Sequence, residues 1–162
     1  MKVIFAIGGL AVAGAVAAAW AGPSDEFDPV TFFTGRSHGE GTLHEVFKGD
    51  RRVRVDSVGR VAKGGVLILD QTVRVEGDKP KTRRWQLRPA REGWSGTLTD
   101  AKGQVVASRD GESIRIRYKM DGGLKVEQVL TPRPGWRQVD NKMKIKKFGM
   151  VVARLDEKIV KR

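Results

Sequence analysis

The chain has 162 residues, which fits one ordinary domain with its own hydrophobic core, and its 40% apolar content argues against disorder. It has no cysteine, which excludes disulfide frameworks, thiolate zinc sites, cysteine nucleophiles and lipid anchors on cysteine. A net charge of +12 predicts attraction to anionic polymers or membrane surfaces and says nothing about the fold.

The first 21 residues have the pattern of a secretory signal peptide. A single charge at Lys2 precedes an apolar run from Val3 to Ala19, and Ala19-Trp20-Ala21 satisfies the small-x-small cleavage rule. Cleavage after Ala21 predicts an exported domain over residues 22–162. The alternative is an uncleaved N-terminal anchor, because the run is only slightly short for a membrane span. No later segment of the sequence approaches that length.

Residues 28–41 predict one short helix followed by a loop. Asp28 has the position of a helix N-cap, with Pro29 at the first helical position. Gly35 lies where such a helix would end, so we expect a helical turn over Pro29–Phe33. Residues 37–41 (SHGEG) contain too many glycines for the interior of an element, and we expect a loop there.

From Thr42 onward the sequence has a period of two. The clearest case is the alternation of Ile114 and Ile116 with Arg115 and Arg117. Such alternation is typical of strands with one solvated face. Glycine-containing turns separate these runs and favour antiparallel hairpins, about eight to ten strands in all. Because a long open sheet exposes its edges, we predict an all-β fold in the form of one up-and-down barrel. A β-sandwich is the main alternative.

The inward positions of this pattern define a candidate ligand site. Most are aliphatic, and the polar residues that share their parity are Ser57, Gln71, Tyr118, Gln128, Asn141 and Glu157. A barrel that holds one small ligand often places a few polar groups among apolar walls. The alternative is a filled core whose polar groups bond to one another or to buried water. The residues expected to contact a ligand are Val55, Leu69, Gln71, Trp85, Ile116, Tyr118, Val126, Gln128 and Met143.

The sequence contains no convincing catalytic or metal motif. Residues 93–97 (GWSGT) lack the final glycine of a nucleophile elbow and are predicted to lie on a hairpin. His38, Glu40, His44 and Glu45 match no helical metal-binding spacing, and exposed loop histidines are the simpler interpretation. We therefore expect no enzymatic activity, no metal and no cofactor.

The order of several short motifs resembles an exported bacterial family, domain-of-unknown-function family 3833. The motifs are Asp28-Pro29 with Phe33, then Gly35, Gly39 and Gly41, Arg83-Arg84-Trp85-Gln86-Leu87, Trp94-Ser95-Gly96, Asn141-Lys142-Met143 and Lys147-Phe148-Gly149. They extend over nearly all of residues 22–162. The resemblance implies a lipocalin-like barrel in the bacterial periplasm with no established activity. The chain departs from lipoproteins by having no cysteine near the cleavage site, and from lipocalins proper by having no Gly-x-Trp on the first strand.

Two functions from different classes remain open. The first is a lipocalin-like module that holds a small hydrophobic or amphiphilic ligand, such as an acyl chain, inside the barrel. The second is a filled barrel whose basic exterior binds anionic envelope polymers or lipid headgroups. The runs at 51–54 (RRVR), 81–84 (KTRR) and 142–147 (KMKIKK) would supply that exterior. Nucleic acid is not an expected partner of an exported protein.

Overall fold

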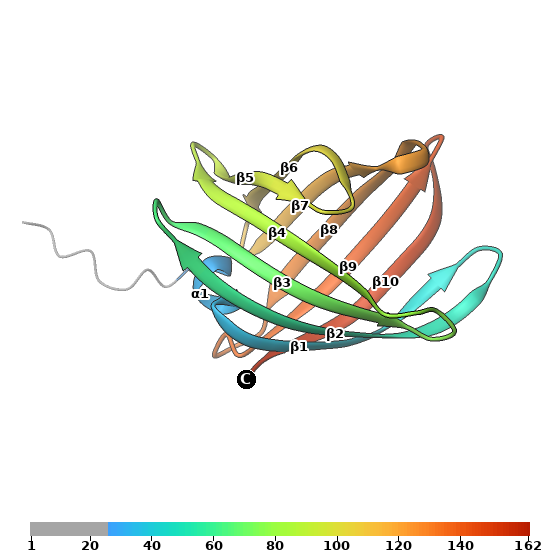
Figure 1. Ribbon diagram of the computed structural model, residues 1–162, viewed down its shortest axis with the longest axis horizontal. Helices are drawn as coiled ribbons and strands as arrows, with labels where there is room; N and C mark the ends of the chain where they lie inside the picture. The colour runs from blue at the N-terminus through green and yellow to red at the C-terminus, as the bar shows by residue number, and fades with distance from the viewer. Residues whose placement is uncertain (1–25) are drawn as a thin grey trace, which may run out of the picture.

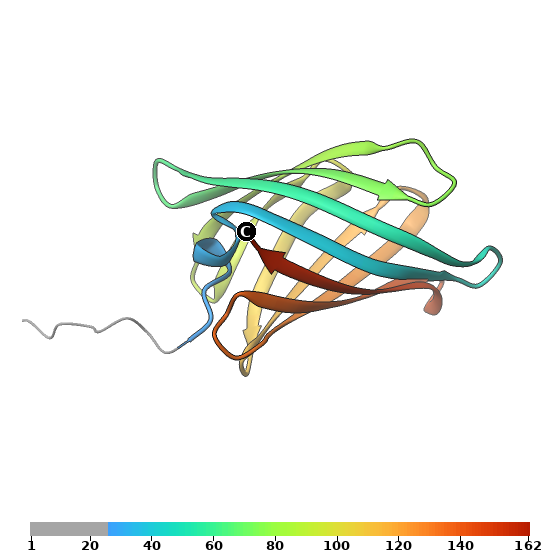
Figure 2. The same cartoon turned by 90° about the horizontal axis from the view of Figure 1, so that it is seen from below.

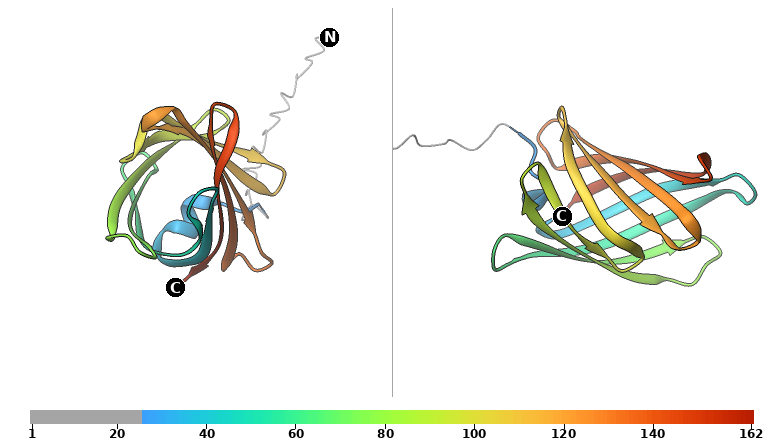
Figure 3. Two further views of the ribbon diagram at one scale, coloured as in Figure 1. Left: turned by 90° about the vertical axis from the view of Figure 1, so that its right-hand side faces the viewer. Right: turned by 90° about the horizontal axis from the view of Figure 1, so that it is seen from above.

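Ten antiparallel strands close into one barrel in the computed structural model, which describes residues 26–162 (Figure 1). Each strand pairs with its neighbours along the chain, and β1 pairs with β10 to complete the ring. The left view of Figure 3 looks along the barrel and shows this closure. The predicted up-and-down barrel is confirmed, and the β-sandwich is excluded. The predicted signal peptide over residues 1–21 lies outside the described residues.

The turns between the strands alternate between the two ends of the barrel. The strands are β1 (Gly35–Glu45), β2 (Gly49–Ala62), β3 (Val66–Val75), β4 (Lys81–Ala90), β5 (Gly93–Leu98), β6 (Ala101–Asp110), β7 (Ser113–Met120), β8 (Leu124–Pro132), β9 (Gln138–Lys147) and β10 (Met150–Lys161). A helix, α1 (Pro29–Phe33), lies at the end where β1 begins. We call this the helix end, and it also carries the turns after β2, β4, β6 and β8. The turns after β1, β3, β5, β7 and β9 form the opposite end, which we call the far rim; the turn after β7 includes a 3-10 segment, η1 (Asp121–Gly123).

Local sequence explains why α1 forms where it was predicted. The Asp28 carboxylate accepts hydrogen bonds from the backbone N–H groups of Val30 at 3.0 Å and Thr31 at 3.1 Å. Pro29 occupies the first turn, where a missing N–H costs nothing. The helix ends before Gly35, whose φ of +90° is one that residues with a side chain rarely adopt.

Helix α1 and the residues before it form an apolar plug across the helix end. Phe27, Phe32 and Phe33 are all buried, and their rings contact one another with centroids 5.6 and 4.9 Å apart. The plug lies close against β2: a Cβ added to Gly59 would lie 1.9 Å from the backbone oxygen of Phe33. Gly59 is therefore required for this close approach.

Two basic residues hold the plug in place. The Lys161 ammonium donates to the backbone oxygens of Thr31 at 2.7 Å, Phe32 at 2.9 Å and Thr34 at 2.7 Å, so a cation satisfies the last carbonyls of the helix. Figure 2 shows the C-terminal end of β10 beside α1. Arg109 on β6 donates to the backbone oxygen of Phe27 at 2.9 Å.

The loop predicted over residues 37–41 is wrong, because these residues lie inside β1. A Cβ on Gly39 would lie 2.0 Å from Glu157 Oε1, and one on Gly41 would lie 2.3 Å from the backbone oxygen of Asp156. The glycines leave space for β10 and its inward glutamate. In this strand they serve close packing rather than a turn.

Candidate ligand-binding cavity

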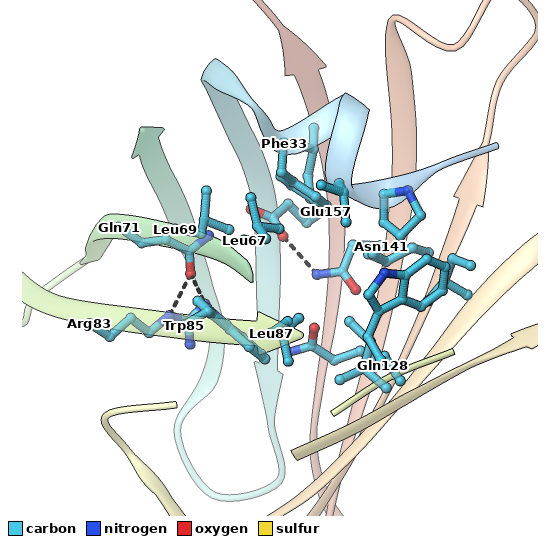
Figure 4. Close-up of a pocket in the computed structure, with 18 residues that line it drawn as sticks. Phe33, Leu67, Leu69, Gln71, Arg83, Trp85, Leu87, Gln128, Asn141 and Glu157 are labelled. Carbon is cyan, nitrogen blue, oxygen red and sulfur yellow. Dashed lines mark hydrogen bonds between the residues drawn. The ribbon is translucent and has the colours of Figure 1, made fainter. Parts of the chain in front are cut away.

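A cavity of about 60 Å³ lies inside the barrel directly beneath α1 (Figure 4). Its apolar lining is Pro29, Val30, Phe33, Leu67, Leu69, Trp85, Leu87, Trp94, Ala107, Ile114, Ile116, Leu130 and Ile159. Its polar lining is Gln71, Arg83, Gln128, Asn141 and Glu157, contributed by five different strands. Apolar walls with a few convergent polar groups are the usual form of a small-molecule site.

The polar residues occupy one end of this cavity. On each strand that contributes both kinds of residue, the polar one lies farther from α1 than an apolar one. The pairs are Leu69 and Gln71 on β3, Leu87 and Arg83 on β4, Leu130 and Gln128 on β8, and Ile159 and Glu157 on β10. The cavity therefore has an apolar end under α1 and a polar end toward the middle of the barrel.

A cationic side chain reaches this polar end from β4. The Gln71 Oε1 atom accepts hydrogen bonds from Arg83 Nε at 2.8 Å and from Trp85 Nε1 at 2.7 Å (Figure 4). Gln71 Nε2 donates to Ser57 Oγ at 3.0 Å. The Arg83 guanidinium lies 5.6 Å from the centroid of the Trp85 ring. It forms no ion pair with a carboxylate of residues 26–162. Among the described residues its charge is therefore met by the Gln71 amide and the Trp85 ring and not by a carboxylate, although the side chain is only half-buried.

A buried carboxyl lines the cavity from β10. Glu157 is 8% exposed, and its Oε2 accepts a hydrogen bond from Asn141 Nδ2 at 2.8 Å. Burial raises the pKa of the Glu157 carboxyl, although this hydrogen bond and the charge of Arg83 oppose the shift. The other amide atom, Asn141 Oδ1, is buried and has no hydrogen-bond partner in the described part of the chain. A donor placed in the cavity would satisfy it.

Gln128 is positioned by two interior residues that do not line the cavity. Its Nε2 donates to the Tyr118 hydroxyl at 3.1 Å and lies 3.4 Å from Met143 Sδ. The Tyr118 ring packs edge-on against Trp85, with centroids 5.6 Å apart. Burial raises the pKa of the Tyr118 phenol, so this group acts as a neutral hydrogen-bonding partner.

The structure brings five of the predicted contact residues to the cavity: Leu69, Gln71, Trp85, Ile116 and Gln128. The other four lie elsewhere in the interior. Tyr118 and Met143 contact Gln128, Val55 belongs to a smaller apolar cluster with Val53 and Leu155, and Val126 is buried on β8. Contact of any of the nine with a ligand remains a prediction.

The residues predicted from the sequence to contact a ligand include neither Arg83 nor the α1 residues that cover the cavity. Arg83 belongs to the basic run at 81–84, but it shares the inward parity of Trp85 and Leu87. Its neighbour Arg84 points outward and pairs with Asp70. The alternation of inward and outward residues along β4 is therefore the sequence signal that identifies Arg83 as an interior residue.

The histidines lie on β1 rather than in a loop, and each lies near two carboxylates: His38 near Asp56 and Glu40, and His44 near Asp50 and Asp156. His38 Nδ1 lies 2.7 Å from Asp56 Oδ1, and His44 Nδ1 lies 2.7 Å from Asp50 Oδ1. Within residues 26–162 no three His, Asp or Glu side chains are grouped to hold a metal ion. In the same range, no helix has the length and apolar character needed to cross a membrane.

Comparison with known proteins places this barrel in a family. A family model described as "Protein of unknown function (DUF3833)" matches residues 9–161. The chain belongs to this family. The structure is also similar to the S-type phycobiliprotein lyase CPES from Guillardia theta, with a TM-score of 0.62 and 10% identity over 82% of this chain and 90% of that chain. At that identity the similarity shows a shared lipocalin-like fold and nothing further. No curated protein matches the sequence.

Proposed function

We propose that this DUF3833 protein binds a small amphiphile with an acidic group inside the barrel beneath α1. The observation that carries the proposal is the inward guanidinium of Arg83, which lacks an ion-pair partner in residues 26–162 and lies at the polar end of an apolar cavity. Keeping a cation partly away from water is costly unless it is paired. A ligand carboxylate would supply that pairing, and a guanidinium can donate two hydrogen bonds to it.

The geometry orients such a ligand. Its apolar part would lie against Val30, Phe33 and the aliphatic walls under α1, and its acidic group would face Arg83. The unpartnered Asn141 Oδ1 would accept a hydrogen bond from a ligand hydroxyl or from a water beside the carboxylate. Burial raises the pKa of Glu157, which disfavours a second negative charge beside that of the ligand.

The volume of the cavity limits what enters without movement. A volume of about 60 Å³ holds a few water molecules. A ligand with a long acyl chain must therefore displace side chains inside the barrel. Helix α1, which covers the cavity, is the part best suited to move, because it is a five-residue segment fixed by side-chain contacts and not by strand pairing. Binding of a long chain is therefore expected to shift α1.

A competition assay tests the proposal. Dansyl-labelled undecanoic acid is titrated into the protein, then displaced with decanoate or with decanol, which has the same chain length and no charge. Arg83→Gln should weaken decanoate binding by about 10- to 100-fold, the range expected for a hydrogen-bonded charge, and leave decanol binding unchanged. Arg84→Gln is the matched control, because Arg84 is adjacent in sequence but faces outward.

Two results would overturn the proposal: no saturable binding of the labelled acid, or equal effects of Arg83→Gln and Arg84→Gln. Ile116→Arg provides a second test, since it places a charge in the apolar wall and should abolish binding. Its fold is checked by circular dichroism, because an interior arginine can also prevent folding.

We further infer that the protein binds its ligand without chemical conversion and is exported. The residues that line the cavity include no histidine and no hydroxyl nucleophile. Recovery of the probe unchanged by mass spectrometry after prolonged incubation tests the first point. The intact mass of the mature protein tests the second, since cleavage after Ala21 leaves Gly22 as the first residue.

A further inference from the structure

Four lysines form one continuous row across the outside of the barrel near the far rim. In the strand register, Lys102 on β6 lies opposite Lys119 on β7, Lys119 lies opposite Lys125 on β8, and Lys125 lies opposite Lys146 on β9. We call these residues the lysine row. Like charges directly opposite one another destabilise a sheet, so this arrangement costs stability. An external anion would offset that cost.

The lysine row borders a groove of about 710 Å³. The groove exists because the β6–β7 pairing is interrupted between Lys102 and Val106. Glu127 is the single carboxylate among the residues that line the groove, and it already pairs with Arg115 and Arg117. The groove is therefore a concave, strongly cationic surface.

Ion pairs neutralise much of the basic exterior on β2 to β4, whereas other basic side chains, such as Lys142, Lys144 and Arg154, have no ion pair among residues 26–162. The pairs on β2 to β4 include Arg51 with Glu45 and Asp78, Arg52 with Glu76, Arg60 and Arg84 with Asp70, and Arg74 with Asp56. In the lysine row, Lys102 pairs with Asp121 at 3.1 Å, whereas Lys119, Lys125 and Lys146 have no ion pair among residues 26–162. What sets the row apart is the strand register, which places its four lysines directly opposite one another across four adjacent strands.

Apolar side chains project from the far rim beside this patch. Phe148 lies in the β9–β10 turn, two residues after Lys146, and is 88% exposed; Met150 follows at 67%. Phe148 also has a φ of +50°, which is unfavourable for a bulky residue. In such turns this conformation is usually adopted by Asn or Gly. Phe47, in the neighbouring β1–β2 turn, is 94% exposed. These turns project at the end of the barrel opposite α1 (Figure 1).

We propose that the lysine row and the exposed Phe148 and Met150 dock this protein on an anionic lipid bilayer. The lysines attract the headgroups, each contributing near the surface, while the phenylalanine and methionine enter the interface between headgroups and acyl chains. A soluble polyanion would need only the lysines. The exposed apolar residues at a strained turn are what favour a membrane. The inference does not depend on ligand binding inside the barrel.

The test uses sedimentation with vesicles of pure phosphatidylcholine and with vesicles that also contain phosphatidylglycerol. The wild type should bind only the anionic vesicles, and added salt should release it. Lys119→Gln with Lys125→Gln should weaken binding by about 30-fold, from roughly fivefold per lysine near the surface. The matched control is Lys63→Gln with Arg91→Gln, which removes the same charge from two turns at the helix end.

A second pair of variants tests the apolar contribution. Phe148→Asn removes the ring and suits the positive φ, so it should weaken vesicle binding several-fold without lowering the melting temperature. Trp136→Asn is its control, because Trp136 is an exposed aromatic residue with a φ of +52° in the β8–β9 turn at the opposite end. Trp136→Asn should leave vesicle binding unchanged.

Three outcomes would overturn the proposal. Equal losses in the Lys119–Lys125 and the Lys63–Arg91 double variants would mean that net charge alone drives binding. Binding of soluble polyphosphate as tight as that of vesicles, with no effect of Phe148→Asn, would identify a polyanion site instead. Failure of the wild type to bind anionic vesicles at low salt would leave the patch to a protein partner. None of these results bears on probe binding by Arg83, so the two proposals can fail separately.

Discussion

Substitution of Gly59 by alanine tests how tightly the plug is held. The added Cβ would lie 1.9 Å from the Phe33 backbone oxygen, whereas real Cβ contacts are at least 3.0 Å. The two groups must therefore separate by more than 1 Å. Both lie on backbone, so no side-chain rotation relieves the contact. Either α1 moves outward or β2 bends.

The structure sets the limits of the effect on stability. Overpacking with local adjustment costs about 1–3 kcal/mol. Complete release of the plug would expose Phe27, Phe32 and Phe33, which are 3%, 3% and 8% exposed in the native state. At about 1.5–3 kcal/mol for each phenylalanine, that sets an upper limit of about 5–9 kcal/mol. We expect Gly59→Ala to lower the free energy of unfolding by about 2–4 kcal/mol, between these limits.

Urea unfolding followed by circular dichroism measures this change. Val58→Ala is the control, because Val58 is the adjacent residue on β2 and is 55% exposed on the outer face; its cost should stay below about 1 kcal/mol. Proteolysis of the segment before β1 should also accelerate in Gly59→Ala. A change of less than about 1 kcal/mol in Gly59→Ala would refute the close approach of α1 to β2.

Three further predictions concern single side chains. Lys161→Met removes the cation from the three carbonyls at the end of α1 and should cost about 1.5–3 kcal/mol in thermal or urea unfolding; an unchanged stability would mean that the plug does not need this contact. Glu157→Gln should match the wild type below the unfolded pKa of about 4.3. It should then become increasingly more stable than the wild type as pH rises toward the raised folded pKa, because the native carboxyl resists ionisation; a pH-independent difference would contradict its burial. Lys125→Gln removes two like-charged cross-strand pairs and should raise stability by about 0.5 kcal/mol at low salt, with the gain vanishing in high salt.

Local patterns in the sequence were sufficient to predict most of the fold. Alternation such as that of Ile114 and Ile116 with Arg115 and Arg117 placed strands, and Asp28 with Pro29 placed α1. The failure at residues 37–41 has a specific cause. Glycine signals both turns and close packing, and only the register between β1 and β10 shows that Gly39 accommodates Glu157.

The two proposed sites depend on information that single strands do not carry. The inward position of Arg83 follows from parity on β4, but its isolation from carboxylates depends on which strands surround it. The lysine row depends on the register of three strand pairs and on the interruption in β6. In the sequence its members are separated by other residues, and only Lys146 belongs to one of the recognised basic runs.

The two ends of the barrel differ in structure and charge, and this difference links the two proposals. The helix end is closed by a plug that Lys161 and Arg109 hold, while the far rim carries the lysine row and Phe148. Inside, Arg83 lies on the side of the cavity that faces the far rim. An acidic amphiphile bound there would have its charged group toward the docked membrane and its apolar part toward α1. Exchange with that membrane would then require the acidic group to leave first, or α1 to open on the opposite side. The variants separate these routes: Gly59→Ala should accelerate probe exchange if the ligand passes α1, and Lys119→Gln with Lys125→Gln should slow exchange from anionic vesicles if it passes the far rim.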